Sequence, residues 1–432
     1  MTIAPLIAVV TRRLQLQLRS VTWWGASVLM FAVFAAAAYR SVPLFDMDRA
    51  TFESDQARHA DEASGLPQTY SRLSLSIDRE PAPLRLLLRG SEDAFAASVT
   101  TYGRFRPTAF RGRDTRSSYE SSLFLVDPAM VLGLLGSLLA IVLASSTVVR
   151  EREEGTLQLT LTYPCRRSTI LFGEHLATLL IVATPMLGCT LVFLAFAAVS
   201  ERLRLDGPVL LQVAQFLGLC ILLASAFSGL GLLVATTVRR PTTAITIAFA
   251  LWVFLVFAYP IVLPSIAALV RPVEPSASSL AAADTLAEYD LVRRANDVST
   301  SAAEQDELRG HLAQADLHDS LALVSPYSVF IIGVETATGT GTAACRAFLQ
   351  TVQTAASQFR RWQDGMLSRY PDRATWYDPA NPPLDLTGLP PNQTERSGLS
   401  GRSAPAALIL LVWNALFIVV TQVQFARYDA RP

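Results

Sequence analysis

The sequence predicts an all-α polytopic membrane protein with six transmembrane helices, an N-terminal interfacial helix and two large extracytoplasmic segments. Three observations predict this class. Apolar residues make up 51% of the 432 residues and charged residues 17%, whereas soluble domains carry about 25% charged residues. The apolar residues gather in uncharged runs long enough to cross a bilayer, which takes roughly 20 residues. Arginines flank these runs asymmetrically, as membrane topology requires.

The first element is an amphipathic segment, residues 1–20. Its apolar side chains follow the i, i+3, i+4, i+7 spacing of one helix face, namely Ile3, Leu6, Ile7, Val10, Leu14 and Leu18. The polar side chains are expected to point elsewhere, namely Arg12, Arg13, Gln15 and Arg19. Such a helix would lie in the cytoplasmic interface of the membrane. An unstructured basic tail is the alternative.

Six apolar runs are long enough to span a membrane: 21–39, 128–149, 176–200, 207–238, 241–270 and 403–425. None of them contains Asp, Glu, Lys, Arg or His, so no ion path or proton relay is indicated. The first run, with alanines at 36–38, also resembles the core of a cleaved signal peptide. Its length favours a retained span.

Arginines in the short flanking segments predict the orientation. With the N-terminus inside, these cytoplasmic arginines are Arg12, Arg13, Arg19, Arg150, Arg152, Arg166, Arg167, Arg239, Arg240, Arg427 and Arg431. The one short outside loop holds Arg202 and Arg204. Both termini, including the tail 426–432, are therefore expected in the cytoplasm of a bacterium, with the spans in its inner membrane. Segments 40–123 and 271–402 would lie outside, because long segments translocate regardless of charge.

The outside segments are expected to be mainly helical, with a few strands in the first. Helices are predicted over 44–64, 280–323 and 343–370. Asp46 or Asp48 would cap the first of these helices. Residues 71–78 alternate apolar and polar side chains and predict a strand. A proline-rich stretch before the last span predicts an extended tether.

Composition excludes several classes of function. The chain contains no lysine, so it lacks the P-loop lysine of an ATPase and any Schiff-base lysine. Its 36 basic and 36 acidic residues balance, so no affinity for nucleic acid is implied. Four dispersed cysteines indicate neither a disulfide framework nor a zinc site. His311 and His318 could share a helix face, but a solvated face is preferred to a metal site. No catalytic, cofactor or metal residue is predicted.

The loop 150–175, between the second and third spans, carries the most informative motif. It reads Glu-x-Glu-x-Gly-Thr-Leu, then Pro-x-x-Arg, then a Gly-Glu pair before the third span. The loop is either a docking surface for a cytoplasmic protein or an ordinary positively charged anchor. Its pattern resembles the permeases of type-2 ATP-binding-cassette (ABC) exporters, through Glu151, Glu153, Gly155, Thr156, Leu157, Pro164 and Arg167.

The resemblance extends to the six spans and the interfacial helix, with one departure. Glu174 stands where the family usually has lysine. The large outside segments, with the stretches 325–327 and 338–341, resemble the subgroup that includes gliding-motility and nitrous-oxide-reductase maturation permeases.

The resemblance implies a separate ATPase subunit that binds ATP and Mg²⁺, and a second permease subunit that forms a homodimer or heterodimer with this chain. The loop would act as a coupling helix for the ATPase through Glu151, Glu153, Glu154, Gly155, Thr156, Leu157, Pro164, Arg166 and Arg167. The outer end of the fifth span would break at Pro260 and Pro264, or be kinked there. Small residues of the fourth span would serve the dimer, or packing within the chain: Gly218, Ser225, Ser228, Gly229 and Gly231.

The sequence thus favours the permease subunit of an ABC exporter for a lipid-like or amphipathic cargo. Membrane lipids would surround it. An alternative keeps the ATPase but uses the outside segments to act mechanically on an envelope protein. A membrane scaffold or sensor without an ATPase is a further alternative. A membrane enzyme is disfavoured, because the apolar runs hold no Asp, Glu or His for catalysis.

Overall fold

The computed structural model describes most of the chain, and the statements below concern those parts alone. The described residues are 3–64, 69–70, 73–90, 96–102, 109–112, 127–153, 155, 166–200, 205–273, 310, 313–314, 316–373, 384, 387 and 403–426. Most of the helix predicted over 280–323 lies outside them.

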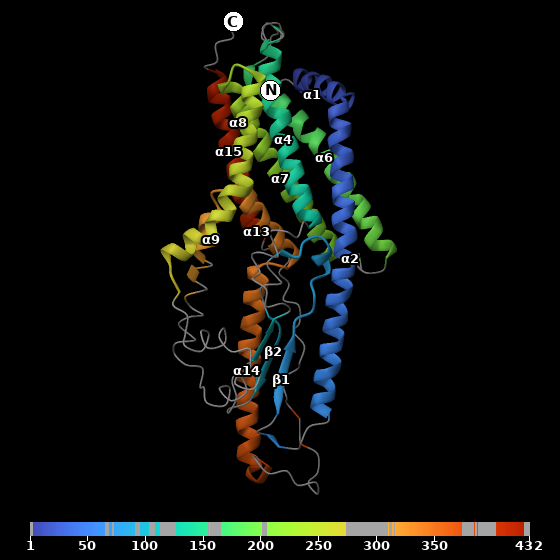
Figure 1. The fold of residues 1–432 in the computed structure, drawn as a ribbon, viewed down its shortest axis with the longest axis vertical. Helices are drawn as coiled ribbons and strands as arrows, with labels where there is room; N and C mark the ends of the chain where they lie inside the picture. The colour runs from blue at the N-terminus through green and yellow to red at the C-terminus, as the bar shows by residue number, and fades with distance from the viewer. Residues whose placement is uncertain are drawn as a thin grey trace.

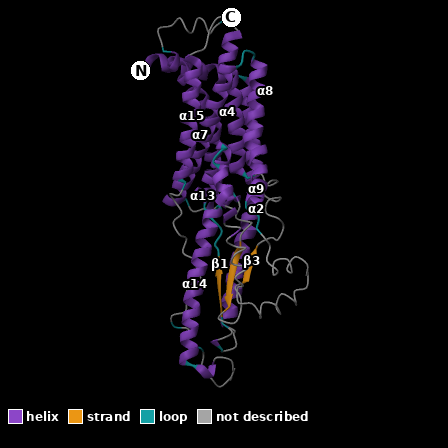
Figure 2. Ribbon diagram, turned by 90° about the vertical axis from the view of Figure 1, so that its left-hand side faces the viewer, coloured by secondary structure: helices purple, strands orange, loops and turns teal. Residues whose placement is uncertain are grey.

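Six helical segments are long and apolar enough to cross a membrane, which confirms the predicted number of spans. They are α2 (Val21–Ser64), α4 (Pro128–Glu153), α6 (Arg167–Val199), α7 (Gly207–Thr237), the segment Pro241–Val270 and α15 (Ala404–Ala426). Figures 1 and 2 show them as one elongated bundle. Both chain termini lie at the same end of this bundle, here called the terminal end (Figure 1). A small sheet lies beyond the opposite end, here called the sheet end.

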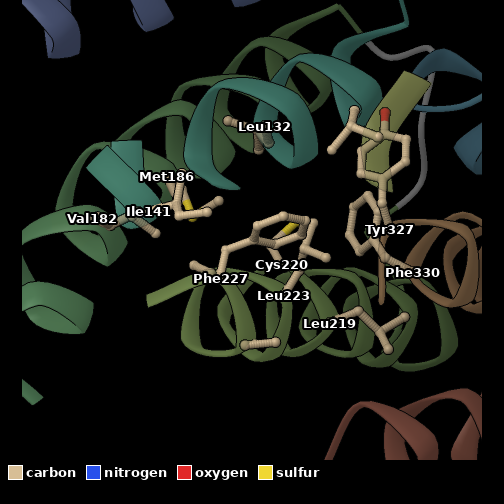
Figure 3. Close-up of a cluster of buried hydrophobic side chains, with 14 of the residues drawn as sticks. Leu132, Ile141, Val182, Met186, Leu219, Cys220, Leu223, Phe227, Tyr327 and Phe330 are labelled. Carbon is tan, nitrogen blue, oxygen red and sulfur yellow. The ribbon is translucent and has the colours of Figure 1, made fainter. Parts of the chain in front are cut away.

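Helix α7 is the centre of the bundle core. It packs against α4, α6, α15 and the shorter α13 (Pro326–Thr338). Figure 3 shows side chains from these elements converging, among them Ile141, Met186, Phe227 and Phe330, all of which are buried. The last two turns of α7 approach α4 closely, because Gly231 has no side chain there. A Cβ at Gly231 would lie 2.6 Å from the carbonyl oxygen of Ile141.

Helix α2 extends far beyond the predicted first span, residues 21–39. It continues without interruption through Pro43 to Ser64, so the helix predicted over 44–64 is confirmed, but it is the continuation of the first span and has no start of its own. Asp48 is not a cap. Its carboxylate is buried and forms an ion pair with Arg85, whose Nε lies 2.8 Å from Oδ2 of Asp48. The role of Asp48 is therefore to pair with Arg85 of the following segment, a contact that no local sequence pattern reveals.

The sheet end carries a three-stranded antiparallel sheet of β1 (Ser74–Asp78), β2 (Ala96–Tyr102) and β3 (Ala109–Gly112). The strand predicted over 71–78 is confirmed from Ser74 onward, whereas β2 and β3 were not predicted. Helix α14 (Thr342–Arg369) confirms the helix predicted over 343–370. The sheet and α14 enclose a separate core of Tyr70, Leu73, Leu75, Ile77, Val99, Phe348, Val352 and Phe359.

The fifth span is irregular immediately before Pro260, one of the two prolines at which a break or kink was predicted, whereas it is helical around Pro264. Helix α8 (Pro241–Val253) passes into a π-helical turn, η4 (Phe254–Ala258), and then into α9 (Tyr259–Val270). Pro260 lies in the first turn of α9, and Pro264 lies inside α9. Because proline has no N–H, Pro260 cannot continue the regular ladder, and the turn before it widens. In Figure 1, α9 leaves the bundle obliquely.

Candidate coupling site

Two helices form the arms that flank the predicted coupling segment at the terminal end. The first arm is the last turn of α4, where Arg150, Glu151, Arg152 and Glu153 are helical. Gly155 follows with φ +71°, and its amide donates a hydrogen bond of 3.1 Å to the carbonyl of Arg152. This left-handed glycine ends the helix in the way that C-terminal glycines commonly do.

The second arm is the first turn of α6, which begins at Arg167 after an extended Arg166. The guanidinium of Arg167 donates to the carbonyl oxygens of Phe425 and Ala426, at 3.5 and 3.4 Å. The start of α6 is thereby tied to the end of α15. The remaining predicted coupling residues, Glu154, Thr156, Leu157 and Pro164, lie outside the described residues.

Helix α6 begins nine residues before the apolar run at 176–200, and the extra turns contain Glu174 and His175. Both side chains are buried. The uncharged run 176–200 is therefore only part of α6, because the helix begins earlier and includes both residues. The apolar run ended at these residues, but the helix does not, because each of them finds a polar partner on a neighbouring helix.

Glu174 is paired with the N-terminal helix α1 (Ile3–Leu18). The Nε of Arg13 lies 3.3 Å from Oε2 of Glu174, and the side chains are 13% and 7% exposed. The Nη2 of the same guanidinium donates to Oγ1 of Thr147 on α4, at 3.1 Å. Arg13 was expected to point away from the packed face of α1, and this expectation is wrong. Its partners lie on two helices far along the chain.

Helix α1 packs closely against α6. A Cβ at Gly173 would lie 2.8 Å from Cγ1 of Val9, so the glycine permits this approach. Of the predicted apolar face, Val10 is buried, whereas Ile7 and Leu18 are exposed. The helix thus buries one side against α6 and presents apolar side chains on another.

His175 ties α6 to α7. Its Nε2 lies 3.0 Å from the hydroxyl of Ser225, and its Nδ1 lies 3.2 Å from the hydroxyl of Ser228. A neutral imidazole has one donor and one acceptor nitrogen, so one serine accepts a hydrogen bond and the other donates one. Both ring nitrogens are thereby satisfied in the core.

The small residues of α7 separate into two groups. A Cβ at Gly229 would lie 3.0 Å from Phe417 of α15, and Gly231 faces α4 as described above. Together with Ser225 and Ser228, these positions are used for packing inside the chain. A Cβ at Gly218, by contrast, would meet no atom within 4 Å.

The described ends of the two arms are charged, through Arg150, Glu151, Arg152 and Glu153 on α4 and Arg167 on α6. Within the described parts of the chain, no group of three metal-ligating side chains is found. The described polar groups at the terminal end include guanidinium, carboxylate, imidazole and hydroxyl groups that connect helices.

Comparison with known proteins identifies this arrangement of helices. The model of a family described as "ABC-2 family transporter protein" matches residues 7–430. The chain belongs to the ABC-2 transporter family. This confirms the predicted family and includes the arms, α1 and all six apolar helices.

Curated relatives agree with that family. The probable ABC transporter permease protein NosY of Pseudomonas aeruginosa is 32% identical over 131 residues, which is 30% of this chain and 47% of the relative. The protein of the same name from Stutzerimonas stutzeri is 32% identical over 138 residues, which is 31% of this chain and 49% of the relative. The chain thus matches about half the length of these relatives.

Proposed function

We propose that this ABC-2 family protein is the permease subunit of an ABC transporter in a bacterial inner membrane, with its terminal end in the cytoplasm. A separate ATPase subunit, which binds ATP and Mg²⁺, docks on the segment 150–173. The observation that carries this proposal is the pair of arms. Helix α4 ends in a charged turn and a left-handed Gly155, and α6 restarts at Arg167, at the position of the family motif.

The same proposal includes a second permease subunit and an export direction. Gly218 supports the dimer, because this small residue of α7 leaves space that its own chain does not fill. The absence of charged residues from the six apolar runs of the sequence supports a lipid-like or amphipathic cargo. Export follows the family resemblance.

A second candidate function is mechanical transmission to an envelope protein, and the continuity of α2 favours it. This helix runs from the terminal end to the sheet without a break. His59 near its far end lies 2.8 Å from Asp78 of β1, and Asp48 binds Arg85. The sheet unit is therefore fastened to a membrane helix at two heights, and movement of that helix would move the sheet.

The experiment is site-specific crosslinking in cells that also produce an ABC ATPase of the same organism. A photo-crosslinking amino acid at Thr156 is expected to capture the ATPase. The same amino acid at Gln350, an exposed position on α14, serves as the matched control. Capture from Gln350 and not from Thr156 would reject the proposal. In addition, a cysteine at position 350 is expected to react with an impermeant thiol reagent from outside, and a cysteine at Ser168 is not.

A further inference from the structure

One side chain, that of Arg13, connects three helices at the terminal end. Its Nη2 donates to Thr147 Oγ1 on α4, while its Nε faces Glu174 Oε2 on α6. The hydroxyl proton of Thr147 is already given to the carbonyl of Leu143, at 2.8 Å, so its lone pairs are available to Arg13. The guanidinium thus contacts α4 and α6 through two of its nitrogens, while the backbone of Arg13 belongs to α1.

The two helices that Arg13 connects are the arms of the coupling segment. Thr147 lies within two turns of the end of α4 at Glu153, and Glu174 lies within two turns of the start of α6 at Arg167. At 1.5 Å per residue, each partner is about 10 Å along its helix from the segment. A change in the spacing of the arms must therefore stretch or break this bridge.

The bridge is buried. Thr147 is 1% exposed and Glu174 is 6% exposed. A carboxylate in such surroundings needs a cationic partner, because the loss of one member of a buried pair leaves an uncompensated charge. Arg13 donates a hydrogen bond to Thr147 and forms an ion pair with Glu174, and the planar guanidinium keeps these two contacts at a fixed relative position, which a flexible ammonium does not do.

The packing of α1 against α6 places Arg13 beside Glu174. Gly173, the residue before Glu174, leaves the space that Val9 of α1 occupies. Val10 is buried on the same helix. Arg12, the next residue along α1, is exposed and provides a natural comparison.

From this geometry we propose that Arg13 is a positioning residue that sets the spacing of the two arms, and so the shape in which the coupling segment is presented to the ATPase. The proposal rests on the proposed function. Helix α1 then takes part in coupling the ATPase to the bundle. Loss of its contact with α6 abolishes this coupling, although every residue that touches the ATPase is still present.

The test must separate positioning from charge compensation, because Arg13→Ala alone leaves Glu174 buried without its cation. The double variant Arg13→Ala/Glu174→Gln removes both the bridge and the buried charge. It is expected to fold and insert like wild type. Arg12→Ala is the matched control, since it removes an exposed arginine from the same helix.

The first measurement is the distance between spin labels on the two arms, by electron–electron double resonance in reconstituted protein. Labels are placed at Glu153→Cys and Ser168→Cys after replacement of Cys165 and Cys345 by serine. Wild type and Arg12→Ala are expected to give one narrow distance distribution. The double variant is expected to give a broadened or shifted distribution.

The second measurement is ATP hydrolysis by an ABC ATPase of the same organism, with each permease variant added in nanodiscs. The double variant is expected to lose the permease-dependent part of the rate, while half-maximal stimulation still requires the same permease concentration. An unchanged distance distribution or an unchanged stimulated rate would each overturn the proposal. If wild type itself neither binds nor stimulates the ATPase, the proposed function fails instead, and the distance measurement still decides whether Arg13 sets the arm spacing.

Discussion

At the terminal end of the bundle Arg13 faces Glu174 at 3.3 Å, whereas at the sheet end Arg85 contacts Asp48 at 2.8 Å. Both pairs are buried, yet their surroundings differ. Arg85 lies in the short helix η2 (Pro83–Leu86), whose leucines join the bundle core, and Arg89 contacts the same carboxylate at 3.5 Å. The sheet-end pair therefore lies in a contact between η2 and α2, here called the sheet-end joint, in which the leucines of η2 pack into the bundle core.

The terminal-end pair, by contrast, connects helices that end a few residues away. Glu174 and Thr147 lie near the ends of α6 and α4, where the charged turns begin. The comparison teaches that burial alone does not define the role of an ion pair. The role depends on the position of the pair in its helices. The Asp48–Arg85 pair lies within packed structure, whereas the Arg13–Glu174 pair lies near two helix ends, whose spacing we propose it sets.

The largest effect is expected from Asp48→Asn at the sheet-end joint. The substitution removes the carboxylate that Arg85 and Arg89 share, and breaking a buried ion pair typically costs about 3–5 kcal/mol. Thermal unfolding of the purified protein in detergent, followed by tryptophan fluorescence, is expected to shift to clearly lower temperature. A variant that melts with wild type would show that the joint is not held by charge.

A smaller loss is expected from Gly231→Ala, which tests the core between the two ends. The added Cβ would lie 2.6 Å from the Ile141 carbonyl oxygen, so α7 and α4 must separate. Overpacking of this kind costs about 1–3 kcal/mol, measured as a lower unfolding temperature.

The matched control is Gly218→Ala on the same helix, where no atom lies within 4 Å of the new Cβ. Its unfolding temperature is expected to match wild type. A bulkier Gly218→Leu is expected to lower the dimer fraction in light scattering. A dimer of unchanged stability would remove Gly218 from the proposed subunit interface.

Gly155→Val is expected to affect coupling while leaving the bundle intact. A β-branched residue at φ +71° is strained by about 1–3 kcal/mol, and the exposed end of α4 can release this strain by changing its path. Permease-dependent ATP hydrolysis is expected to fall, with an unchanged unfolding temperature. Gly155→Asn, which tolerates the left-handed region, is expected to retain most of the activity.

The smallest effect is expected from Arg49→Ala. Arg49 and Glu53 form an exposed pair at 3.0 Å on α2, one residue beyond the buried Asp48. Such helical surface pairs contribute about 0.3–0.5 kcal/mol. The unfolding temperature is therefore expected to change little, and a loss comparable to that of Asp48→Asn would mean that position on α2, and not burial, determines the cost.

The sequence predicted the number of apolar helices well, because each run of uncharged residues has a physical reason to leave water. It failed where a helix continues through polar residues. Helix α6 includes Glu174 and His175, and α2 continues past Tyr39 to Ser64. In both helices the buried polar side chains, such as Glu174 in α6 and Asp48 in α2, are paired with residues distant in sequence, and no local pattern contains that information.

The candidate site was predictable to a similar extent. The motif around Gly155 marked the end of α4, because a glycine after a charged helix end favours the left-handed conformation seen there. Arg13 was missed, since amphipathic spacing assigns an arginine to the solvent side of a helix. Strands β2 and β3 were missed as well, because their apolar and polar residues do not alternate clearly.

The order in which the chain is synthesised determines when the contact between α1 and α6 can form. Helix α1 leaves the ribosome first, but Gly173 and Glu174, which form its seat, are synthesised much later. Until α6 has been inserted, Val9 lacks the surface at Gly173 and the Arg13 guanidinium lacks its ion-pair partner Glu174. Docking of α1 is thus a late event in biogenesis. Nascent chains arrested before α6 are expected to expose this helix to proteases that can no longer reach it once the third apolar helix is in place.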